Sequence, residues 1–478
     1  MLRCARWVLR ARRCPVQPAP GIHVIDVGWR NERDGEAIRE QLVLSVETDP
    51  GLMGCPACGV VALSQGRRIR RLRDIPAFGA PVELLWRVRR WRCVEPSCPI
   101  GTFTEGNDLA FARAKLTTRA AWWAISCIQR DTASVAALAR RLGVDWHTVW
   151  KAIAPLLEEL ADDPARLAGV EVLGVDEHIW HHAPRPGKGP KELTGMVDLT
   201  HQPDLRPGKT GQVRPRARLL DLVPGRSGRA YAEWLNSRGE AFTSGIQVAT
   251  LDPFRGYGNA IRDELEDAVA VLDAFHVVKL GLQAMEETRR RVQQHQLGHR
   301  GHKNDPLYSI RRPLHAGAEK LTARQVDRID AALAAGDPNW EVTIAWWSYQ
   351  DLRSAYATKD LRAGKKIAER VLGSFHTCPV PEIARLGRTL RSWRQAFLAY
   401  FDTGRANNGG TEAICIIELH RRIARGFRNP HNVIWAHRSG PRRSKNSRTV
   451  ALLPPGAAQA TRRVSWSTTT ISYLWFFL

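Results

Sequence analysis

Apolar and polar positions alternate with period two in several parts of the chain, which predicts strands there. Near the N-terminus, residues 41–48 (QLVLSVET) and 82–93 (VELLWRVRRWRC) have this pattern. Farther along, VEVLGVDEH, ELTGMVDLT and RARLLDLVPG predict three successive strands. The segments IQVATLD and AVAVLDA predict two more strands, each separated from the previous one by a helical segment. Three strands in meander followed by alternating helices and strands predict a mixed α/β domain.

Helical periodicity dominates residues 108–160, and we expect helices throughout this region. Within residues 134–153, apolar residues recur at helical spacing on both sides of a GVD break, which is a helix-turn-helix pattern. The second helix would present Trp146, His147, Thr148 and Lys151 to a DNA groove. An ordinary helical hairpin with a mixed exposed face is the alternative interpretation.

The predicted α/β domain has the order of elements expected of an RNase H-like fold, with a helical insertion from about residue 280 to residue 405. Trp346, Trp347 and Trp393 of the insertion are either DNA-stacking or core residues. A closing helix is expected to start near Thr411.

These patterns predict a multidomain α/β protein. We expect its parts to be a disordered basic leader (1–20), a zinc-ribbon domain (21–107), a helix-turn-helix DNA-binding domain (108–165), a first catalytic part (166–280), a helical insertion (281–405), a closing catalytic helix (406–432) and an aberrant, disordered tail (433–478).

The charge balance changes the expected partner. The 478 residues include 71 Lys and Arg against 48 Asp and Glu, a net charge of +23, which favours a polyanion such as double-stranded DNA. No apolar segment reaches the roughly 18 residues of a membrane helix, and the N-terminus lacks the apolar core of a secretory signal. We therefore expect no membrane partner and a cytoplasmic location.

Four of the nine cysteines have the spacing of a metal site. Cys55 and Cys58 form one pair, and Cys93 and Cys98 form a second pair across a spacer long enough for a β-hairpin. Two such knuckles are typical of a zinc ribbon, in which four thiolates surround a structural Zn²⁺ and leave no open position for substrate. Chance burial of the four thiols is the alternative.

Acidic residues end three of the predicted strands. Asp176 follows VLGV, Asp252 follows IQVATL, Asp273 follows AVAVL, and Glu412 lies in the first turn of the closing helix. Oxygen ligands of this kind suit Mg²⁺ or Mn²⁺, and two such ions assist phosphoryl displacement. Taken singly, an Asp at a strand end is more often a turn former or a helix cap.

Several motifs resemble those of the bacterial insertion-sequence transposases of the ISL-three type. They are GVDEH, LDPFRGYGNAI, VLDAFHVVKL and NNGGTEAICIIELHRRIARGFRN, together with the upstream CPACG and RRWRCVEPSCPIGTFTE. The resemblance covers about residues 40–432. It implies a DDE transposase whose zinc ribbon and helix-turn-helix bind terminal inverted repeats, and which acts on the nucleoid as a homo-oligomer.

Carried over to this sequence, the resemblance implies that Asp176, Asp252 and Glu412 are the catalytic, Mg²⁺-binding acids. Asp273 is the rival for the second acid. His276, one turn into the next helix, either contacts phosphate or a metal ligand, or only packs beside a capping Asp273. Glu418 is the rival of Glu412, although a solvated position suits it better.

The implied activity is metal-dependent DNA cleavage and strand transfer of an insertion sequence. After residue 432 the sequence departs from the family and loses periodicity, which we interpret as a reading-frame change, and a change of this kind can inactivate a copy. The alternative function is a non-enzymatic or inactivated zinc and helix-turn-helix DNA-binding protein.

Overall fold

The computed structural model describes residues 21–34, 37–180, 191–203, 213–215, 217–405, 417–420 and 422–423. The predictions for the leader (1–20), Glu412 and the tail (433–478) lie outside these residues. Among the described helices, none is long and apolar enough to cross a membrane.

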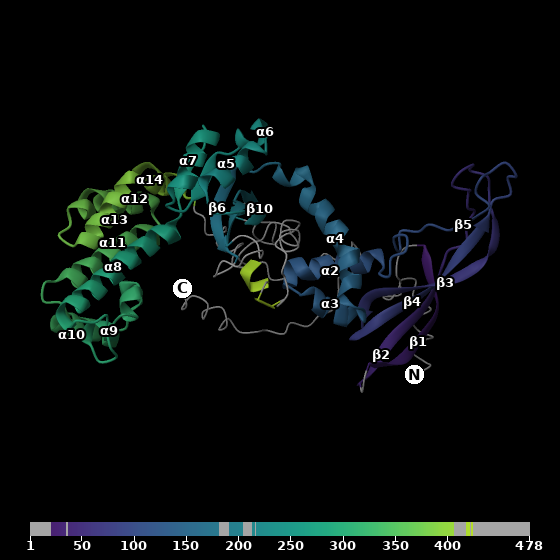
Figure 1. Cartoon of the computed structure of the whole chain (residues 1–478), viewed down its shortest axis with the longest axis horizontal. Coiled ribbons are helices and arrows are strands. Elements are labelled where there is room, and N and C mark those ends of the chain that lie inside the picture. The colour runs from purple at the N-terminus through teal and green to yellow at the C-terminus, as the bar shows by residue number, and fades with distance from the viewer. Residues whose placement is uncertain are drawn as a thin grey trace. The chain divides into compact units, whose positions relative to one another are not determined.

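The N-terminal part contains a five-stranded sheet (Figure 1). The strands run in the order β1-β2-β4-β3, and β5 pairs with β4 beyond the zinc knuckles. Their bounds are β1 Ile22–Asp34, β2 Ala37–Thr48, β3 Leu63–Ala77, β4 Ala80–Arg92 and β5 Thr102–Thr104. The pattern at residues 41–48 and 82–93 predicted β2 and β4. It missed β1, because a bulge between Val24 and Asp26 interrupts the alternation that marks a strand.

One face of this sheet is apolar. Leu44, Leu72, Leu84 and Trp86 are fully buried there and pack with Leu109. The β3–β4 hairpin closes through Phe78 and Gly79, which both have positive φ angles of 54° and 79°. Two positive φ values suit the tight turn whose twist matches the flanking strands.

Three helices follow the sheet: α2 Thr118–Asp131, α3 Val135–Leu142 and α4 Trp146–Asp162. Thr117, Ser134 and Asp145 cap their N-termini through side-chain oxygens. The prediction of helix from residue 108 is wrong for residues 108–117. The backbone of residues 115–117 instead pairs with Arg73 of β3, so contact with the sheet overrides the local helical preference.

The second sheet has the order β10-β7-β6-β11-β12. Strands β10, β7 and β6 are antiparallel, whereas β11 pairs in parallel with both β6 and β12. The bounds are β6 Val172–Ile179, β7 Glu192–Asp198, β10 Arg218–Pro224, β11 Val248–Leu251 and β12 Val269–Leu272; β8 His201–Pro203 and β9 Val213–Pro215 form a separate pair.

The 3₁₀ turn η1 Pro164–Leu167 precedes the first strand of this sheet. The helices between its strands are α5 Gly228–Asn236, α6 Glu240–Thr243 and α7 Arg255–Glu264. Helices α5 and α7 approach closely at two glycines, because a Cβ on Gly228 would lie 2.4 Å from the carbonyl oxygen of Gly256. This close approach fixes the start of α7, immediately after the strand end that carries Asp252.

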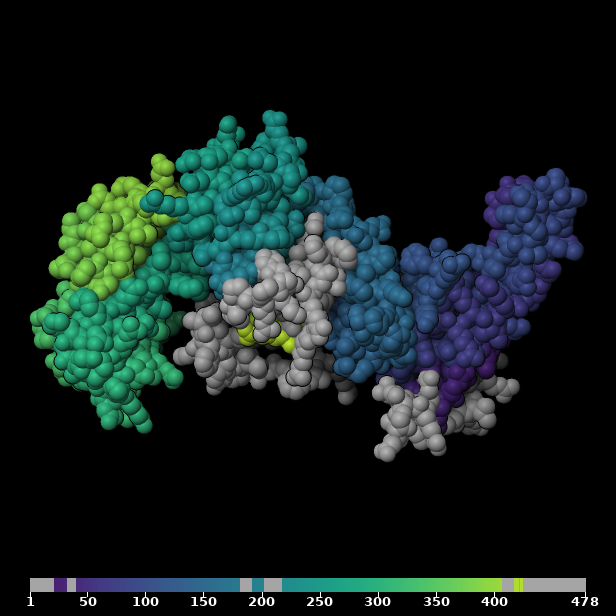
Figure 2. All heavy atoms as spheres, viewed as in Figure 1, coloured from purple at the N-terminus to yellow at the C-terminus, as the bar shows by residue number. Residues whose placement is uncertain are grey.

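The helical segment begins with α8 Ala274–Leu297, which crosses the boundary predicted at residue 281 without a break. It continues with α9 Pro306–Ser309, η2 Pro313–His315, η3 Ala318–Lys320, α10 Ala323–Gly336, α11 Glu341–Ala357, α12 Leu361–Ser374, η4 Phe375–Thr377, α13 Pro381–Ser392 and α14 Arg394–Thr403. These helices pack into one body, shown as spheres in Figure 2.

One continuous apolar core joins the second sheet to these helices. It includes Leu173 of β6, Leu251 of β11 and Phe397 of α14. Trp346 is buried in this core, whereas the adjacent Trp347 is exposed. Trp346 is therefore a packing residue, and Trp347 is available for contact with solvent or ligand.

Candidate functional site

Strand register brings the acidic residues of the second sheet into one row. The β6–β11 register pairs Gly174 with Thr250. Asp176 and Asp252, each two residues farther along its own strand direction, therefore lie side by side. The β11–β12 register pairs Leu251 with Leu272, so the next residues are Asp252 and Asp273. Asp252 and Asp273 directly follow the ends of β11 and β12, whereas Asp176, predicted to end its strand, lies inside β6, which continues to Ile179 because it stays paired with β7. The parallel register still places the three carboxylates side by side on three neighbouring strands.

Asp176, Asp252 and His276 form a compact group. Each offers one ligand atom, and these atoms lie within 4.8 Å of one another. The Nδ1 atom of His276 is 2.8 Å from a carboxylate oxygen of Asp252 and 2.8 Å from one of Asp273. Both aspartates of the group are buried, and His276 is partly exposed. The structure thus brings together three residues that lie up to 100 positions apart in sequence.

Asp273 has a structural role as well. Its carboxylate accepts hydrogen bonds from the backbone nitrogen of His276 (3.2 Å) and from the His276 ring (2.8 Å), and so caps α8. Asp252 is different: its buried Oδ1 lies 2.8 Å from Nδ1 of His276 as one side of an ion pair, and among the described residues it accepts no backbone hydrogen bond of the kind that caps α8. A buried carboxylate oxygen that accepts no such hydrogen bond is a suitable ligand for a cation.

The electrostatics of the group also favour a cation. Burial and, after it, the charge of Asp252 raise the pKa of Asp176 to about 7, although the charge of His276 acts in the opposite direction. Burial alone would lower the pKa of His276, but Asp252 and Asp273 outweigh it and raise the pKa to about 10. Protonated His276 compensates one negative charge of the three aspartates, and a divalent cation bound by carboxylate oxygens can compensate the rest. The donor set therefore fits Mg²⁺ or Mn²⁺.

Sequence reasoning missed two further contacts near this group. Glu177 forms an ion pair with Arg226, whose guanidinium lies 5.1 Å from the centre of the Phe254 ring. The charge of Glu177 also interacts with Asp252 and His276. Arg226 lies in the turn after β10, and no local pattern marks it, because only the sheet brings that turn beside β6.

Glu418 lies differently from the expected solvated position. It is half-buried, and its carboxylate is 3.7 Å from Nε2 of His178 and 2.8 Å from Nε of Arg422. His178 is on the same face of β6 as Asp176, since residues two apart on a strand share a face. Glu418 thus contacts the strand that carries Asp176.

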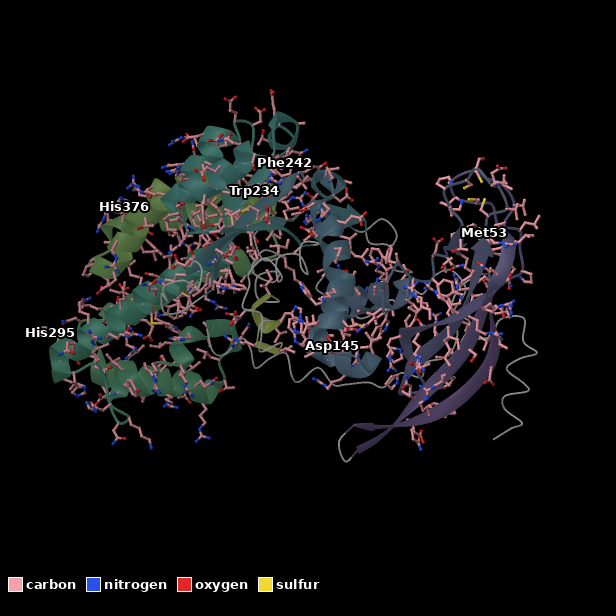
Figure 3. The ribbon with its side chains drawn as sticks, turned by 45° about the vertical axis from the view of Figure 1, so that its right-hand side comes forward. Met53, Asp145, Trp234, Phe242, His295 and His376 are labelled. Atoms are coloured by element: carbon pink, nitrogen blue, oxygen red, sulfur yellow. The ribbon has the colours of Figure 1, made fainter. Side chains whose placement is uncertain are left out.

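The four predicted cysteine ligands form a second group. The sulfur atoms of Cys55, Cys58, Cys93 and Cys98 all lie within 4.8 Å of one another, with Cys55–Cys98 at 3.7 Å and Cys58–Cys93 at 3.5 Å. Corners of a tetrahedron about 2.3 Å from a zinc ion are roughly 3.8 Å apart. The sulfur atoms beside Met53 are drawn in Figure 3. Their spacing fits a structural Zn²⁺.

The thiols of this group differ in acidity. Backbone hydrogen bonds from Cys58 and Ala57 lower the pKa of Cys55 to about 7. A backbone hydrogen bond from Glu95 would lower the pKa of Cys93, but burial and the neighbouring thiols raise it to about 12. Zinc binding to such a group releases protons, because the metal ligand is the thiolate.

The predicted DNA-reading residues lie in the first turns of α4. Trp146 is 50% exposed and stacks on His147, with ring centres 3.9 Å apart. Lys151 is exposed, whereas the Thr148 hydroxyl donates to Asp145, the residue that caps this helix. Trp146, His147 and Lys151 are therefore accessible together, and Thr148 is partly occupied by the cap.

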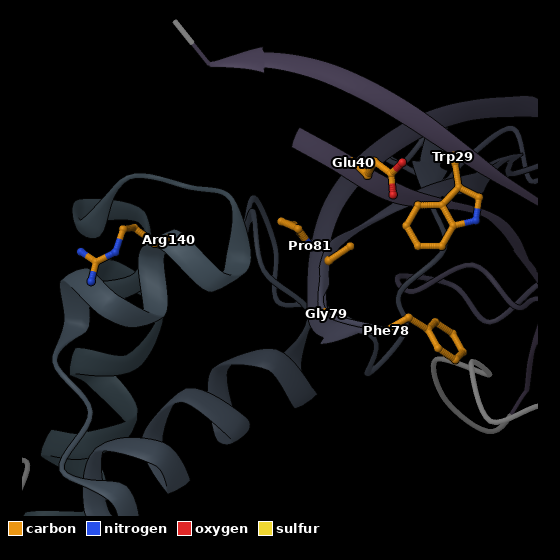
Figure 4. Close-up of a pocket in the computed structure, with 7 residues that line it drawn as sticks. Trp29, Glu40, Phe78, Gly79, Pro81 and Arg140 are labelled. Atoms are coloured by element: carbon orange, nitrogen blue, oxygen red, sulfur yellow. The ribbon is translucent and has the colours of Figure 1, made fainter. Parts of the chain in front are cut away.

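A surface hollow of about 470 Å³ lies elsewhere, in the N-terminal part (Figure 4). Trp29, Phe78 and Pro81 of the sheet and Arg140 of α3 line it. None of the acidic or thiol groups described above belongs to its lining, so this hollow is not the site of their chemistry.

Comparison with known families gives two matches. A family model described as "Transposase" matches residues 173–436, and a model described as "zinc-finger of transposase IS204/IS1001/IS1096/IS1165" matches residues 52–98. The first range includes Asp176, Asp252 and Glu412, and the second includes all four cysteines.

The chain is also similar to curated relatives from two strains of Mycobacterium tuberculosis, CDC 1551 / Oshkosh and ATCC 25618 / H37Rv. Both are described as "Transposase for insertion sequence element IS1557". Each is 24% identical to this chain over 336 residues, which are 66% of this chain and 68% of the relative.

Proposed function

Because the chain belongs to the ISL-three-type insertion-sequence transposases, whose family model matches more than half of it, we propose that it cleaves and joins DNA at the ends of such an element. The proposed catalytic acids are Asp176, Asp252 and Glu412. The observation that carries the proposal is the convergence of Asp176, Asp252 and His276 on one space at the edge of the second sheet.

The strand order β10-β7-β6-β11-β12 supports an RNase H-like catalytic domain. It places three antiparallel strands before two parallel ones, as that fold requires, with the first acid on the central strand. A central strand holds its side chains rigidly, which a site that positions phosphate groups needs.

Each residue of the group has a proposed role. Asp176 and Asp252 would hold the divalent cations, with Glu412 completing the set. Such ions, when bound, polarise the attacking and leaving oxygens of a phosphodiester. His276 would hold the carboxylates of Asp252 and Asp273 at fixed positions, since its ring nitrogen is 2.8 Å from both.

DNA recognition is assigned to the N-terminal part. Helices α3 and α4, joined at Gly143 and Asp145, suit a helix-turn-helix in which Trp146, His147 and Lys151 reach a groove. The zinc ribbon and these helices would together bind the terminal inverted repeats, and the two ends of an element would be brought together by a homo-oligomer.

The test is a strand-cleavage assay on duplex DNA that carries the element's ends, with Mg²⁺ or Mn²⁺. We expect Asp176→Asn to reduce cleavage by roughly 100-fold or more, because an electrostatic contact to the reacting groups is lost. DNA binding should stay unchanged. Asp267→Asn, an exposed aspartate in the loop before β12, is the matched control and should cleave normally.

Cleavage that persists in Asp176→Asn would show that another acid is catalytic. DNA binding without any metal-dependent cleavage by the unaltered chain would favour the alternative, a non-enzymatic or inactivated DNA-binding protein with the same zinc ribbon and helices.

A further inference from the structure

The hairpin formed by β3 and β4 carries more arginine than its packing uses. Residues 63–92 contain nine arginines, no lysine and only two acidic residues. Both acids are buried and paired: Asp74 accepts from Arg119 at 2.8 Å, and Glu83 accepts from Arg30 at 2.7 Å. The hairpin therefore has a large positive charge that its own acids do not neutralise.

Some of the nine arginines have structural partners. Arg67 and Arg89 both form ion pairs with Glu47 of β2. Arg70 donates to the carbonyl of Ala114 at 2.9 Å, and its guanidinium lies 5.8 Å from the centre of the Trp86 ring. These three arginines fasten β3 and β4 to neighbouring segments, and their role is accounted for by the fold.

Of the remaining six, Arg73 pairs through its backbone with residues 115 and 117, and the other five form no ion pair with the described residues. Arg68, Arg71, Arg87, Arg90 and Arg92 are all exposed, and in the described part of the chain no carboxylate lies within ion-pair distance of them. We call these five residues the arginine arm. Their positive charges are not neutralised by acidic residues of the hairpin.

The register distributes the arginine arm over both faces of the hairpin. Ile69 of β3 pairs with Arg87 of β4, and Arg71 is two residues from Ile69, so these side chains share one face. Arg68 pairs with Val88, and Arg90 and Arg92 follow Val88 on the other face. Ile69, between Arg71 and Arg87, is itself 64% exposed.

The arm leads directly to the zinc knuckles, because Arg92 immediately precedes Cys93. Figure 3 shows side chains along the hairpin, which ends at the sulfur atoms beside the labelled Met53. From Arg87 to Arg92 the strand extends about 17 Å. Duplex DNA carries one phosphate charge per about 1.7 Å of its axis, so a strand of this length can face several phosphates.

Protection of a sheet edge does not explain this distribution. Charged residues on an edge strand prevent pairing with other chains, and β3 is an edge strand of its sheet. Arg87, Arg90 and Arg92, however, lie on β4, which is flanked by β3 and by β2 or β5. Three of the five arginines are therefore on a strand whose edges are already covered.

We propose that the arginine arm binds the phosphate backbone of duplex DNA, as a contact surface separate from the exposed residues of α4. This inference rests on the proposed DNA-binding function and names a surface for it. The guanidinium group matches phosphate oxygens with two parallel hydrogen bonds, and its charge displaces counterions from the duplex. Contacts to phosphate position a protein on DNA and do not read its sequence.

The experiment measures DNA affinity as a function of salt for the full zinc-loaded chain, by fluorescence anisotropy. Two double variants are compared with the unaltered chain: Arg71→Gln with Arg87→Gln, and Arg90→Gln with Arg92→Gln. Each phosphate contact contributes about one to the slope of log affinity against log salt. We expect each double variant to reduce this slope by about two, equally on end-bearing and on unrelated duplexes.

Matched controls separate a dedicated surface from total charge. Arg324→Gln with Arg388→Gln removes two exposed arginines of the helical segment and should leave the slope unchanged. Arg90→Lys with Arg92→Lys keeps the charge and should retain the slope. Unchanged zinc content and melting temperature would show that the variants are folded.

The inference is overturned if the arm variants keep the original slope, or if the control variants lose as much. A loss restricted to end-bearing DNA would also overturn it, because that result indicates base reading. Failure of the unaltered chain to bind any duplex would instead contradict the proposed function itself. If the unaltered chain binds and cleaves DNA and the arm variants show the same salt dependence, only the proposal for the arginine arm is contradicted.

Discussion

Two aspartates at adjacent strand ends, Asp252 and Asp273, differ in what their carboxylates already bind. Asp273 caps α8 and holds the ring of His276, so hydrogen bonds to protein groups use much of its acceptor capacity. Asp252 has one buried oxygen that accepts no backbone hydrogen bond among the described residues. At the scale of single residues, this difference favours Asp252 as the second metal ligand and Asp273 as a positioning residue.

Replacement of each aspartate by asparagine tests this assignment. Asp252→Asn should abolish metal-dependent cleavage. Asp273→Asn should lower it by only about 10- to 100-fold, since asparagine still caps a helix and only the orientation of His276 is disturbed. Cleavage rates at saturating Mn²⁺ are the measurement. If Asp252→Asn lowers the cleavage rate only slightly and Asp273→Asn abolishes cleavage, the two roles are reversed.

At the scale of elements, α8 connects the proposed catalytic group to the helical segment. It begins at the Asp273 cap and continues for 24 residues. Its middle carries a buried charged group: Glu286 accepts from Arg289 at 3.1 Å and 3.0 Å and lies 3.2 Å from Nε2 of His315. Burial alone would raise the pKa of Glu286, but the contacts with His315 and Arg289 lower it to about 2.

Glu286→Gln should destabilise the protein by about 1–3 kcal/mol at pH 7, because the buried Arg289 loses its charged partner. Glu287→Gln is the control. It removes an exposed ion pair with Arg385, which should cost less than about 1 kcal/mol. Denaturant unfolding measures both changes.

The pH dependence of the Glu286→Gln effect has a definite sign. The folded-state pKa of Glu286 is lowered, so its contribution to stability is complete above the ordinary value of 4.5 and is lost as the pH falls towards 2. The difference between Glu286→Gln and the unaltered chain should therefore shrink in that window. An equal difference at pH 7 and pH 3 would mean that the carboxylate charge is not responsible.

At the scale of the whole molecule, the N-terminal sheet and the second sheet have separate cores. The cluster that contains Leu44 and Trp86 shares no residue with the cluster that contains Leu173, Leu251 and Phe397. Separate cores can unfold separately, since cooperativity requires shared contacts. The second sheet and the helical segment, in contrast, share one core and should unfold as one unit.

Removal of zinc should therefore unfold one part of the chain only. A chelator specific for zinc should remove the protection of amide hydrogens in residues 55–103 against exchange, because structural zinc sites stabilise small domains directly. Exchange in β6, β11 and α8 should not change. If residues 55–103 stay protected from exchange after complete zinc removal, the zinc ribbon is rejected. If amide protection is lost in all parts of the chain at once, the chain unfolds as one cooperative unit.

Local patterns in the sequence predicted the strands that carry or precede Asp176, Asp252 and Asp273, and also the two cysteine pairs. Each of these features depends on residues close together in sequence, such as an apolar run followed by an acid. The predicted strand end at Asp176 is wrong, because pairing with β7 extends β6 to Ile179. The strand β1 and the non-helical course of residues 108–117 were not predicted, because a bulge in one case and pairing with Arg73 in the other replaced the local preference.

The sequence by itself determined the family and the kinds of ligand available: hard oxygen donors in one part and thiolates in another. Only the tertiary structure decided which of these groups meet. The register of β6, β11 and β12 places Asp252 between Asp176 and Asp273, and the cap of α8 gives Asp273 its separate role. Register and capping depend on contacts between distant segments, whose free energies no single segment of sequence contains.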